Sequence, residues 1–375
     1  MKKENGGFEQ RQKSKKKSST RKKVLIGLLV FLMVLLAVLG GAFIYLSSKL
    51  DKINMVDRDY DNSVYDSIEE LPPEVENPNS EPDTPDSEIK DLESQIDANV
   101  GDDSQSDDSK PKDEPIKLKF SDDVLNVLLI GTDARTSDYR GRSDSMILVS
   151  INKETEEIVM TSIMRDVYLK IPGKGYNRIN ASYAYGGADL LIQTIEQNFK
   201  IRIDKFVQVD FQSFEKVVEA VGGVSIPINS SEITVMKQFG SDMNGKPFSG
   251  AGTYKLNGKQ ALAYSRIRKI GHSDFERTQR QRRVLDEIIK SAKNLSIGEL
   301  SDSLDVILPL VTTDFKKGEL IDLILGSVSY LSYDRVQLRI PADHTYSNMR
   351  IRGMAVLGID FDENRRLMYE TIYGD

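Results

Sequence analysis

Residues 124–130 read VLNVLLI, an almost continuous apolar run that Gly131 ends. Such a run is typical of a strand that is buried on both faces of a sheet. The hydrophobic spacing elsewhere predicts further strands at residues 146–151, 158–162, 206–209 and 224–228, and helices at residues 186–199, 211–220, 257–264 and 273–293. Strands that alternate with helices predict an α/β domain built around a central sheet.

Local signals define the ends of several elements. Asn257 is a candidate N-cap for the short helix, and Ser273 with Glu276 predicts a capping box for the long one. Residues 229–250 are polar, and we interpret them as an irregular insertion. Residues 306–308 and 336–340 are candidate strands, which Pro309 and Pro341 would end.

The N-terminal region carries the signals of a membrane anchor. Residues 24–46 are uncharged and apolar, and they are long enough to cross a bilayer as a helix. Residues 1–23 are strongly basic, so the positive-inside rule places this tail in the cytoplasm and the rest of the chain outside. We therefore predict a single-pass protein of the cell membrane. A cleaved signal peptide is the competing interpretation, but the run is long and no small-x-small site follows it.

Residues 47–120 form a predicted disordered linker between this anchor and a domain at residues 121–375. The segment is rich in Asp, Glu, Ser and Pro, as in PPEVENPNSEPDTPDSE. Such a composition buries too little apolar surface to offset chain entropy, and its like charges repel one another. We expect an extended acidic spacer. The net charge of -7 averages these unlike regions and therefore says little about partners.

The composition excludes several kinds of chemistry. The chain has no cysteine, which rules out disulfides, thiolate metal sites and cysteine nucleophiles. It has two histidines, His272 and His344, which are too few for a His-rich zinc site. A Ser-His-Asp triad is also hard to build from them.

Two aspartates flank the first predicted pair of strands. Asp133 follows the strand at 124–130, and Asp144 precedes the strand at 146–151. If these strands are neighbours, both carboxylates lie at one edge of the sheet, where open α/β sheets bind ligands. Two oxygen ligands without His or Cys favour Mg²⁺, with Mn²⁺ as the alternative, over zinc. The spacing alone is equally compatible with two ordinary turn residues.

A set of arginines points to a phosphate ligand. Arg165 follows the predicted strand at 158–162. Arg266 and Arg268 alternate in YSRIRK, so in an extended segment they would point the same way. The planar fork of arginine suits bidentate contact with phosphate oxygens. Several arginines beside a divalent ion would neutralise a pyrophosphate and its transition state.

The long helix at 273–293 contributes to the same set. Asp274, Arg277 and Gln281 share one face through their i, i+3, i+7 spacing. The predicted buried stripe comprises Val284, Leu285, Ile288 and Ile289. Three further arginines are expected to make surface salt bridges: Arg280, Arg282 and Arg283. Nucleic acid is the rival phosphate ligand. The near-neutral domain, the lack of Trp and the predicted placement outside the membrane all argue against nucleic acid.

Several segments, taken in order, resemble the LytR-CpsA-Psr family. They are LLIGTDAR, GRSDSMILVSIN, TSIMRDVYLKIPG, RINASYAYGG, VDFQSFEKVVEAVGGV, LNGKQALAYSRIRK and SDFERTQRQRRVL. The resemblance covers about residues 122–295, and the basic tail with one membrane span is also the usual family layout. It implies an α-β-α sandwich with a central mixed sheet and a hydrophobic cavity for a polyprenyl tail.

The resemblance also implies an activity in a Gram-positive-type envelope. Anionic glycopolymers, such as teichoic acid or capsule, would pass from undecaprenyl-pyrophosphate carriers to peptidoglycan. It implies that Asp133 and Asp144 hold Mg²⁺ and that Asp274 orients the arginines or acts on the acceptor hydroxyl. The residues implied to bind the pyrophosphate are Arg142, Arg165, Arg266, Arg268, Arg277 and Gln281. Arg178 and Asn180 are weaker candidates, and Met164 stands where many members have Pro.

The residue types then suggest a mechanism and two rivals. A sugar hydroxyl of peptidoglycan would attack the phosphorus nearest the glycopolymer, and polyprenyl phosphate would leave. Asp274, then Asp133, is the candidate general base. A polyprenyl-pyrophosphate phosphatase would use the same site with water as the acceptor. A non-catalytic lipid-binding or regulatory membrane protein is the second rival, although mere binding would not require paired metal ligands.

Overall fold

The computed structural model describes residues 45–58, 82–101, 116–132, 141–238, 248–268, 270, 274–330 and 332–374. The side chains of residues 274, 297, 327 and 328 lie outside this description. The chain divides into two compact units, Met1–Lys52 and Ile53–Asp375. Residues 45–50 of the first unit are helical. All of the following concerns the second unit.

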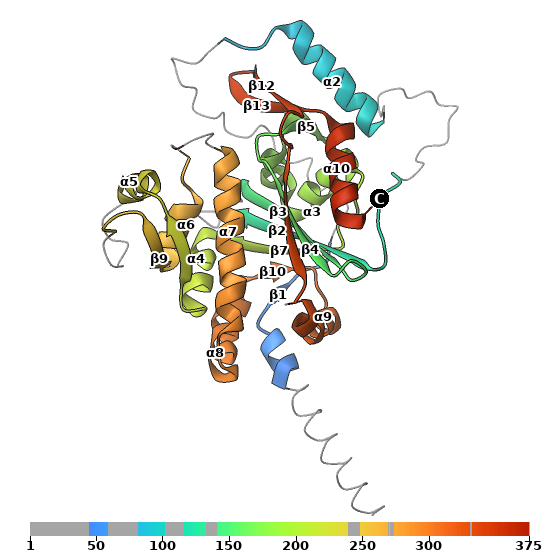
Figure 1. Cartoon of the computed structure of the whole chain (residues 1–375). Helices are drawn as coiled ribbons and strands as arrows, with labels where there is room; N and C mark the ends of the chain where they lie inside the picture. Colours follow the sequence, from blue (N-terminus) through green and yellow to red (C-terminus); the bar gives the residue numbers. More distant parts are fainter. Residues whose placement is uncertain are drawn as a thin grey trace, which may run out of the picture. The chain divides into compact units, whose positions relative to one another are not determined.

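A mixed seven-stranded sheet forms the centre of the described part of this unit (Figure 1). In spatial order its strands are β1 (Asn54–Met55), β10 (Thr312–Thr313), β7 (Lys205–Asp210), β2 (Val124–Thr132), β3 (Ser143–Asn152), β4 (Glu157–Ile163) and β11 (Asp334–Ile340). β2 pairs with β7 in parallel and with β3 antiparallel, and β4 pairs with β3 antiparallel and with β11 in parallel. The carboxyl ends of β2, β4, β7 and β11 therefore lie along the same edge.

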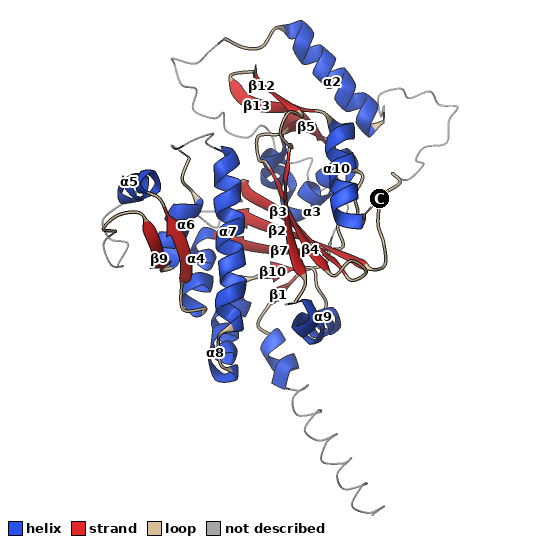
Figure 2. Ribbon diagram, viewed as in Figure 1, coloured by secondary structure: helices blue, strands red, loops and turns tan. Residues whose placement is uncertain are grey.

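Helices cover both faces of the sheet, as Figure 2 shows. One face packs against α3 (Ile179–Phe199) and α10 (Phe361–Tyr373). The other face is covered by a layer that contains α4 (Phe211–Ala220), α5 (Ser230–Gln238), α6 (Gly258–Ser265) and α7 (Asp274–Lys293). The remaining helices are α2 (Asp86–Val100), α8 (Ile297–Ile307), a 3₁₀ turn at Leu308–Leu310, and α9 (Lys317–Tyr330). This α-β-α arrangement agrees with the predicted fold class.

Three two-stranded antiparallel sheets complete the described structure. They are β5 (Tyr168–Ile171) with β6 (Gly175–Arg178), β8 (Val224–Ile228) with β9 (Gly252–Leu256), and β12 (Tyr346–Ile351) with β13 (Met354–Ile359). The β8–β9 sheet shares an apolar core with α4, α5, α6 and α7. The β12–β13 hairpin instead joins the core around α3 and α10.

The strand and helix predictions were confirmed where the hydrophobic pattern was long. The elements α4 and β8 have the predicted bounds, and Asn257 caps α6 in a capping box with Gln260. Two boundaries were wrong. The first strand continues through Gly131 to Thr132. α3 begins at Ile179, ahead of a break at Gly186 and Gly187 where the two halves meet.

Two other predictions were wrong because the segments concerned are helical. Residues 230–238, expected to be irregular, form α5, which buries Ile233 and Met236. The candidate strand at residues 306–308 is the end of α8 and the start of the 3₁₀ turn. Ser296 and Glu299 cap α8 reciprocally, and this signal was present in the sequence.

The predicted linker is also wrong for residues 86–100, which form α2. This helix buries Leu92, Ile96 and Val100 through i, i+4, i+8 spacing, and Leu92 and Ile96 belong to the main core. Its Glu93 accepts a hydrogen bond from the hydroxyl of Tyr168 at 2.9 Å. Burial, together with this carboxylate, raises the pKa of Tyr168 well above its usual value. The acidic composition thus conceals an amphipathic helix that belongs to the folded body.

Residues 24–44 of the predicted membrane span lie outside the described residues. Within the part of the chain that the structure describes, no helix combines the length and the apolar character needed to span a bilayer.

If α2 belongs to the core, removing its central side chain should destabilise the whole unit. Ile96 has no exposed surface. We expect Ile96→Ala to lower the free energy of unfolding by about 2–5 kcal/mol, measured by chemical denaturation. Ser94, an exposed residue of the same helix, provides the control, and Ser94→Ala should change stability by less than about 0.5 kcal/mol. If both substitutions changed the free energy of unfolding by the same small amount, α2 would not be packed on the domain.

Candidate functional site

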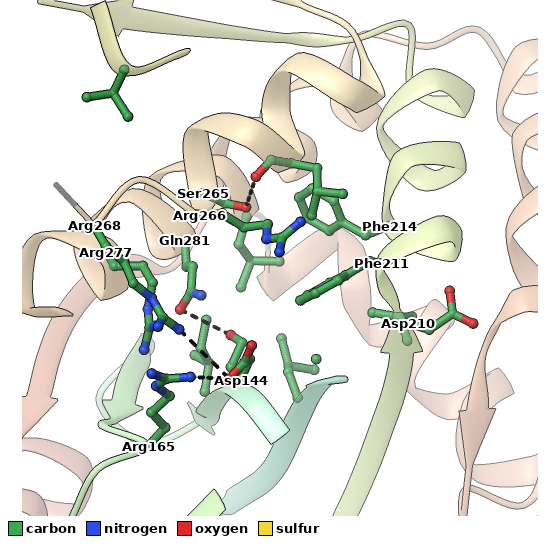
Figure 3. Close-up of a pocket in the computed structure, with 18 of the residues that line it drawn as sticks. Asp144, Arg165, Asp210, Phe211, Phe214, Ser265, Arg266, Arg268, Arg277 and Gln281 are labelled. Atoms are coloured by element: carbon green, nitrogen blue, oxygen red, sulfur yellow. Dashed lines mark hydrogen bonds and ion pairs between the residues drawn. The ribbon is translucent and has the colours of Figure 1, made fainter. Parts of the chain in front are cut away.

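A cavity of about 560 Å³ lies between the sheet and the helices α4, α5, α6 and α7 (Figure 3). It opens at the edge where β2, β4 and β7 end. This is the edge at which open α/β sheets commonly bind ligands. Its wall combines charged side chains with a larger apolar surface.

Paired residues of two strands form the floor of the cavity. Leu129 pairs with Ile147, and Gly131 pairs with Ser145, so all four side-chain positions face the same side. A β-carbon on Gly131 would lie 3.0 Å from the β-carbon of Ser145. The glycine therefore allows the two strands to approach closely at the site.

A β-bulge explains how Asp144 reaches the cavity. The register of β2 and β3 shifts at Gly131 and Thr132, because Gly131 pairs with Ser145 while Thr132 pairs with Ser143. Asp144 is the extra residue in β3. Regular alternation would place it on the opposite face from Ser145, but a bulge redirects a side chain. Both Asp144 and Ser145 therefore line the cavity.

Asp144 is surrounded by guanidinium groups. Its Oδ1 accepts a hydrogen bond from Nη1 of Arg165 at 2.7 Å. Nη2 of Arg268 lies 4.0 Å from the same oxygen. Figure 3 shows Arg268 and Arg277 beside this pair, with Arg266 further along the wall. The predicted convergence of Asp144 with these arginines is thus present in the structure.

A second row of charges holds Arg165 in place. Its Nε lies 3.5 Å from Oδ1 of Asp166, and the same oxygen accepts a hydrogen bond from Nη1 of Arg178 at 3.0 Å. Arg178 is buried and does not line the cavity. Asn180 is also buried away from the cavity wall, and its backbone N–H donates to the carbonyl of Arg165. Arg178 and Asn180 therefore support Arg165 rather than reach the cavity.

Met164, which stands where many members of the LytR-CpsA-Psr family have Pro, fits well into the structure. Met164 packs in the main core, and its backbone N–H donates to the carbonyl of Ile340 at 2.8 Å. Proline, which has no N–H, could not make this bond. Methionine therefore ties the segment carrying Arg165 to the end of β11.

The helix α7 supplies the opposite wall. Arg277 and Gln281 both line the cavity, as their shared helical face predicts. The hydroxyl of Ser145 donates to Oε1 of Gln281 at 3.2 Å, which connects β3 to α7 across the site. Arg277 is only 3% exposed. A guanidinium so deeply buried at a cavity wall is well placed to attract an anion.

Arg266 and Arg268 reach the cavity by a different route from the predicted one. The segment is not extended, because Arg266 is the C-cap of α6 in an α-helical conformation. Its guanidinium carbon lies 4.8 Å from the ring centroid of Phe211, a cation–π contact. Both arginines nevertheless line the cavity.

The rest of the cavity wall is apolar. β7, α4, α5, α6 and α7 each contribute hydrophobic side chains, together with the floor of the sheet. These residues are Leu129, Ile147, Val209, Phe211, Phe214, Val235, Leu262 and Leu285. Sequence reasoning missed most of them. The i, i+3 spacing of Phe211 and Phe214 was the available signal.

Three predicted residues are not placed at the cavity. Asp133 lies outside the described residues, although Thr132 before it pairs with Ser143. Asp274 begins α7, but its side chain is not described. Arg142 is half-buried and is not among the residues of the cavity wall. The metal-binding role predicted for Asp133 and Asp144 and the head-group role predicted for Arg142 remain predictions.

The prediction that three arginines of α7 make surface salt bridges was wrong. Arg280 is 3% exposed and donates from Nε to Oε1 of the buried Glu232 on α5 at 2.8 Å. Arg282 is buried and donates to Oγ of Ser162, and burial lowers its pKa to about 10. It is still cationic at neutral pH. Arg283 donates to the hydroxyl of Tyr264, whose pKa burial raises. These arginines fasten α7 to its neighbours.

The cavity thus unites an anion-attracting end with an apolar interior. Proteins with such a site bind amphiphilic ligands, because apolar walls bury a hydrophobic tail while a few placed polar groups fix the head. The fold and site therefore define an α/β protein with a cavity for a lipid-like molecule that carries a negatively charged head.

The profile of the LytR_cpsA_psr family matches residues 91–371. The chain belongs to this family. It is 38% identical over 221 residues to the polyisoprenyl-teichoic acid–peptidoglycan teichoic acid transferase TagU of Bacillus licheniformis, covering 58% of this chain and 68% of the relative. It is 37% identical over 221 residues to TagT of Bacillus subtilis, a transferase of the same description, with the same coverage.

Solved structures of the family share the fold. A structure described as TagT bound to LI-WTA matches with a TM-score of 0.56 and 30% identity over 68% of this chain and 92% of that chain. Another, of YwtF (TagT) with bound octaprenyl pyrophosphate lipid, matches with a TM-score of 0.53 and 28% identity over 68% and 94% of the two chains.

The buried pair of Arg280 and Glu232 holds the α5 wall of the cavity against α7. Removing one partner leaves the other charge buried without its counterion. We expect Glu232→Ala to lower the free energy of unfolding by about 3–5 kcal/mol, measured by urea denaturation. Glu363, which pairs with Arg366 on the exposed side of α10, provides the matched control. Glu363→Ala should leave the denaturation midpoint unchanged. A similar loss of stability in both variants would show that the buried Arg280–Glu232 pair does not stabilise the domain more than an exposed pair does.

Proposed function

We propose that this chain is a membrane-anchored phosphotransferase that attaches an anionic glycopolymer, of teichoic acid or capsule type, from a polyprenyl-pyrophosphate carrier to peptidoglycan. The single observation that carries this proposal is the continuity of the cavity. The Asp144–Arg165 pair and its neighbouring arginines stand at one end, and an apolar interior adjoins them. The names of the related transferases and of the lipid-bound structure support the same ligand class.

The cavity orients the donor through two kinds of contact. The arginines at positions 165, 266, 268 and 277 offer planar donors to the pyrophosphate oxygens. Phe214, Val235 and Leu262 offer the apolar surface on which a prenyl chain would pack. The donor therefore cannot bind in the reverse orientation, with its pyrophosphate among the apolar side chains, because burying phosphate there is strongly unfavourable.

Among the described residues, Asp144 would be the ligand of a divalent cation. Asp144 uses Oδ1 for Arg165, and within the described residues its Oδ2 accepts no protein hydrogen bond. The described part of the chain contains no cluster of three or more His, Asp or Glu side chains that could enclose a metal. Mg²⁺ commonly takes one or two carboxylates and completes its shell with substrate phosphate and water. When bound, Mg²⁺ or Mn²⁺ would supply further neutralisation of the pyrophosphate charge.

The residues of the site then support a displacement at phosphorus. An acceptor hydroxyl of peptidoglycan attacks the phosphorus attached to the polymer, forming a new O–P bond. The bond from this phosphorus to the bridging oxygen breaks, polyprenyl phosphate leaves, and the hydroxyl proton passes to a base. Arg165 and Arg277 stabilise the charge on the leaving phosphate. Asp274 is the proposed base, and Asp133 is the second choice.

The proposed anchor places this reaction at the outer face of the cell membrane. The apolar run at residues 24–46 would cross the bilayer once with residues 1–23 in the cytoplasm. A lipid-linked donor is confined to the membrane, so anchoring the enzyme there raises its effective concentration near the donor.

Removing Arg165 tests whether the guanidinium cluster acts in the reaction. With the full chain in detergent, a lipid-pyrophosphate donor and peptidoglycan fragments, mass analysis of the linked product should show kcat of Arg165→Ala reduced by about 10²–10³-fold. Arg366, an exposed arginine of α10, is the control, and Arg366→Ala should retain full activity. Release of polymer phosphate at the same rate with and without peptidoglycan would instead establish a phosphatase. Unchanged transfer by Arg165→Ala would show that Arg165 takes no part in the reaction.

Replacing Asp144 tests the proposed metal site separately. We expect Asp144→Asn to raise the Mg²⁺ concentration for half-maximal transfer by at least about tenfold, since even outer partners of a metal ligand contribute that much. Electron paramagnetic resonance of Mn²⁺ titrated into the protein with bound donor should show the same loss of affinity. Asp302→Asn, at an exposed position of α8, is the control. If both variants required the same Mg²⁺ concentration for half-maximal transfer, Asp144 would not be a metal ligand.

A further inference from the structure

A second hollow, of about 780 Å³, lies on another part of the unit, between α2 and the β12–β13 hairpin. Figure 1 shows α2 lying across this hairpin. Gln95 lines the hollow from α2, Tyr346 and Asn348 line it from β12, and Asp360 lines it from the start of α10. We call this hollow the α2 groove.

The α2 groove is built on a fixed base. A β-carbon on Gly358 of β13 would lie 2.8 Å from Sδ of Met349 and 3.2 Å from a methyl carbon of Leu92. The helix therefore packs tightly onto the hairpin at the groove floor. Thr84 adds a two-way contact, since its N–H donates to the carbonyl of Arg350 and its hydroxyl accepts from the Arg350 N–H.

The walls of the α2 groove are polar and carry an excess of negative charge. Carboxylates come from Glu88 and Asp91 on α2 and from Asp360 and Asp362 at the start of α10, whereas Arg365 is the one arginine or lysine among the described lining residues. Arg365 is itself engaged by Asp362. A polymer rich in phosphate would be repelled here. An uncharged ligand with many hydroxyl and amide groups would not be repelled, and the side chains of Gln95 and Asn348 present matching donors and acceptors.

Two contacts connect the walls of the α2 groove to the segments that carry Arg165 and Arg277. The ring of Tyr346 packs against Phe275 with centroids 5.0 Å apart, and Phe275 lies two residues before Arg277 on α7. On the other side, the N–H of Leu357 donates to the carbonyl of Asp166 at 2.8 Å. Asp166 follows Arg165, and Gly358, next to Leu357, lines the groove. The groove thus adjoins the segments that carry Arg165 and Arg277.

We propose that the α2 groove binds the acceptor, a neutral glycan strand rich in hydroxyl and acetamide groups, and leads one of its hydroxyls toward Arg165 and Arg277. This inference rests on the proposed transferase function. It assigns the two substrates to surfaces of opposite character. The anionic donor takes the arginine-lined cavity, and the uncharged sugar chain takes the acidic groove.

Bulky substitutions in the groove provide the test. Gln95→Trp and Asn348→Trp place an indole in the groove from opposite walls, and both native residues are exposed. Ser94→Trp, at the adjacent exposed position of α2 outside the groove, is the matched control. The full chain in detergent is assayed with a lipid-pyrophosphate donor and with peptide-free peptidoglycan oligosaccharides whose lactyl carboxyl groups are capped as amides, so that the acceptor is uncharged. Thermal midpoints verify that all variants are folded.

We expect the KM for the oligosaccharide to rise about tenfold or more in both groove variants, while donor affinity and kcat at saturating acceptor match the Ser94→Trp control. The oligosaccharide should also bind the full chain without donor in saturation-transfer NMR, and Gln95→Trp should abolish this signal. An unchanged acceptor KM in the groove variants, with normal transfer by the native chain, would overturn the groove assignment alone. A rise in donor KM instead would assign the groove to the donor polymer. Absence of any transfer by the native chain would overturn the proposed function itself.

Discussion

The hydrogen-bonded ion pair between Asp144 and Arg165 joins the start of β3 to the segment after β4, and the geometry of the site depends on it. Both side chains are partly buried, at 20% and 17% exposure. Neither would be stable at such a position alone, because a charge removed from water must find a partner. The bulge in β3 supplies the carboxylate, and Asp166 with Arg178 positions the guanidinium from behind. The pair therefore defines where the other arginines converge.

Positive charge nevertheless exceeds negative charge at the cavity wall. Arg165, Arg266, Arg268 and Arg277 line it together with Asp144 and Asp210, and Asp210 is occupied in capping α4 through the N–H of Ser213. An anion entering the cavity would relieve the mutual repulsion of the guanidinium groups. Their arrangement, built before the ligand arrives, is what electrostatic stabilisation of a phosphoryl transition state requires.

The sequence predicted the elements whose signal is local and periodic, and missed those defined by their tertiary neighbours. β2 could be predicted because seven consecutive residues are nearly all apolar, and α4 because Gly222 and Gly223 follow its end. The β-bulge was hidden, because nothing in SDSM distinguishes Asp144 from a regular strand residue. Arg280 was misassigned for a similar reason. An arginine on a charged helix normally faces water, and only the fold brings Glu232 of α5 against it.

The acidic segment before the domain shows the limit of composition as evidence. Averaged over residues 47–120, Asp, Glu, Ser and Pro dominate, and disorder is the natural inference. Yet Leu92, Ile96 and Val100 repeat at the helical spacing, and one buried stripe is enough to attach α2 to the core. The acidic side chains of this segment are therefore compatible with a folded helix. Charges on the outer side of α2 do not unfold the helix, because water still solvates them.

Two substrates that react must meet at one point without competing for the same surface. A polyanionic donor and an uncharged acceptor can be separated by electrostatics alone, provided that the basic and acidic surfaces adjoin near the reacting bond. In this unit the segment from Arg165 to Val167 lies between them. It presents Arg165 to the cavity on one side and bonds to β13, the floor of the α2 groove, on the other. Under this proposal, this one segment fixes the distance between the donor phosphate and the acceptor glycan. The composition suggested that α2 is only a spacer, but α2 forms one wall of the acceptor groove and so contributes to the catalytic geometry.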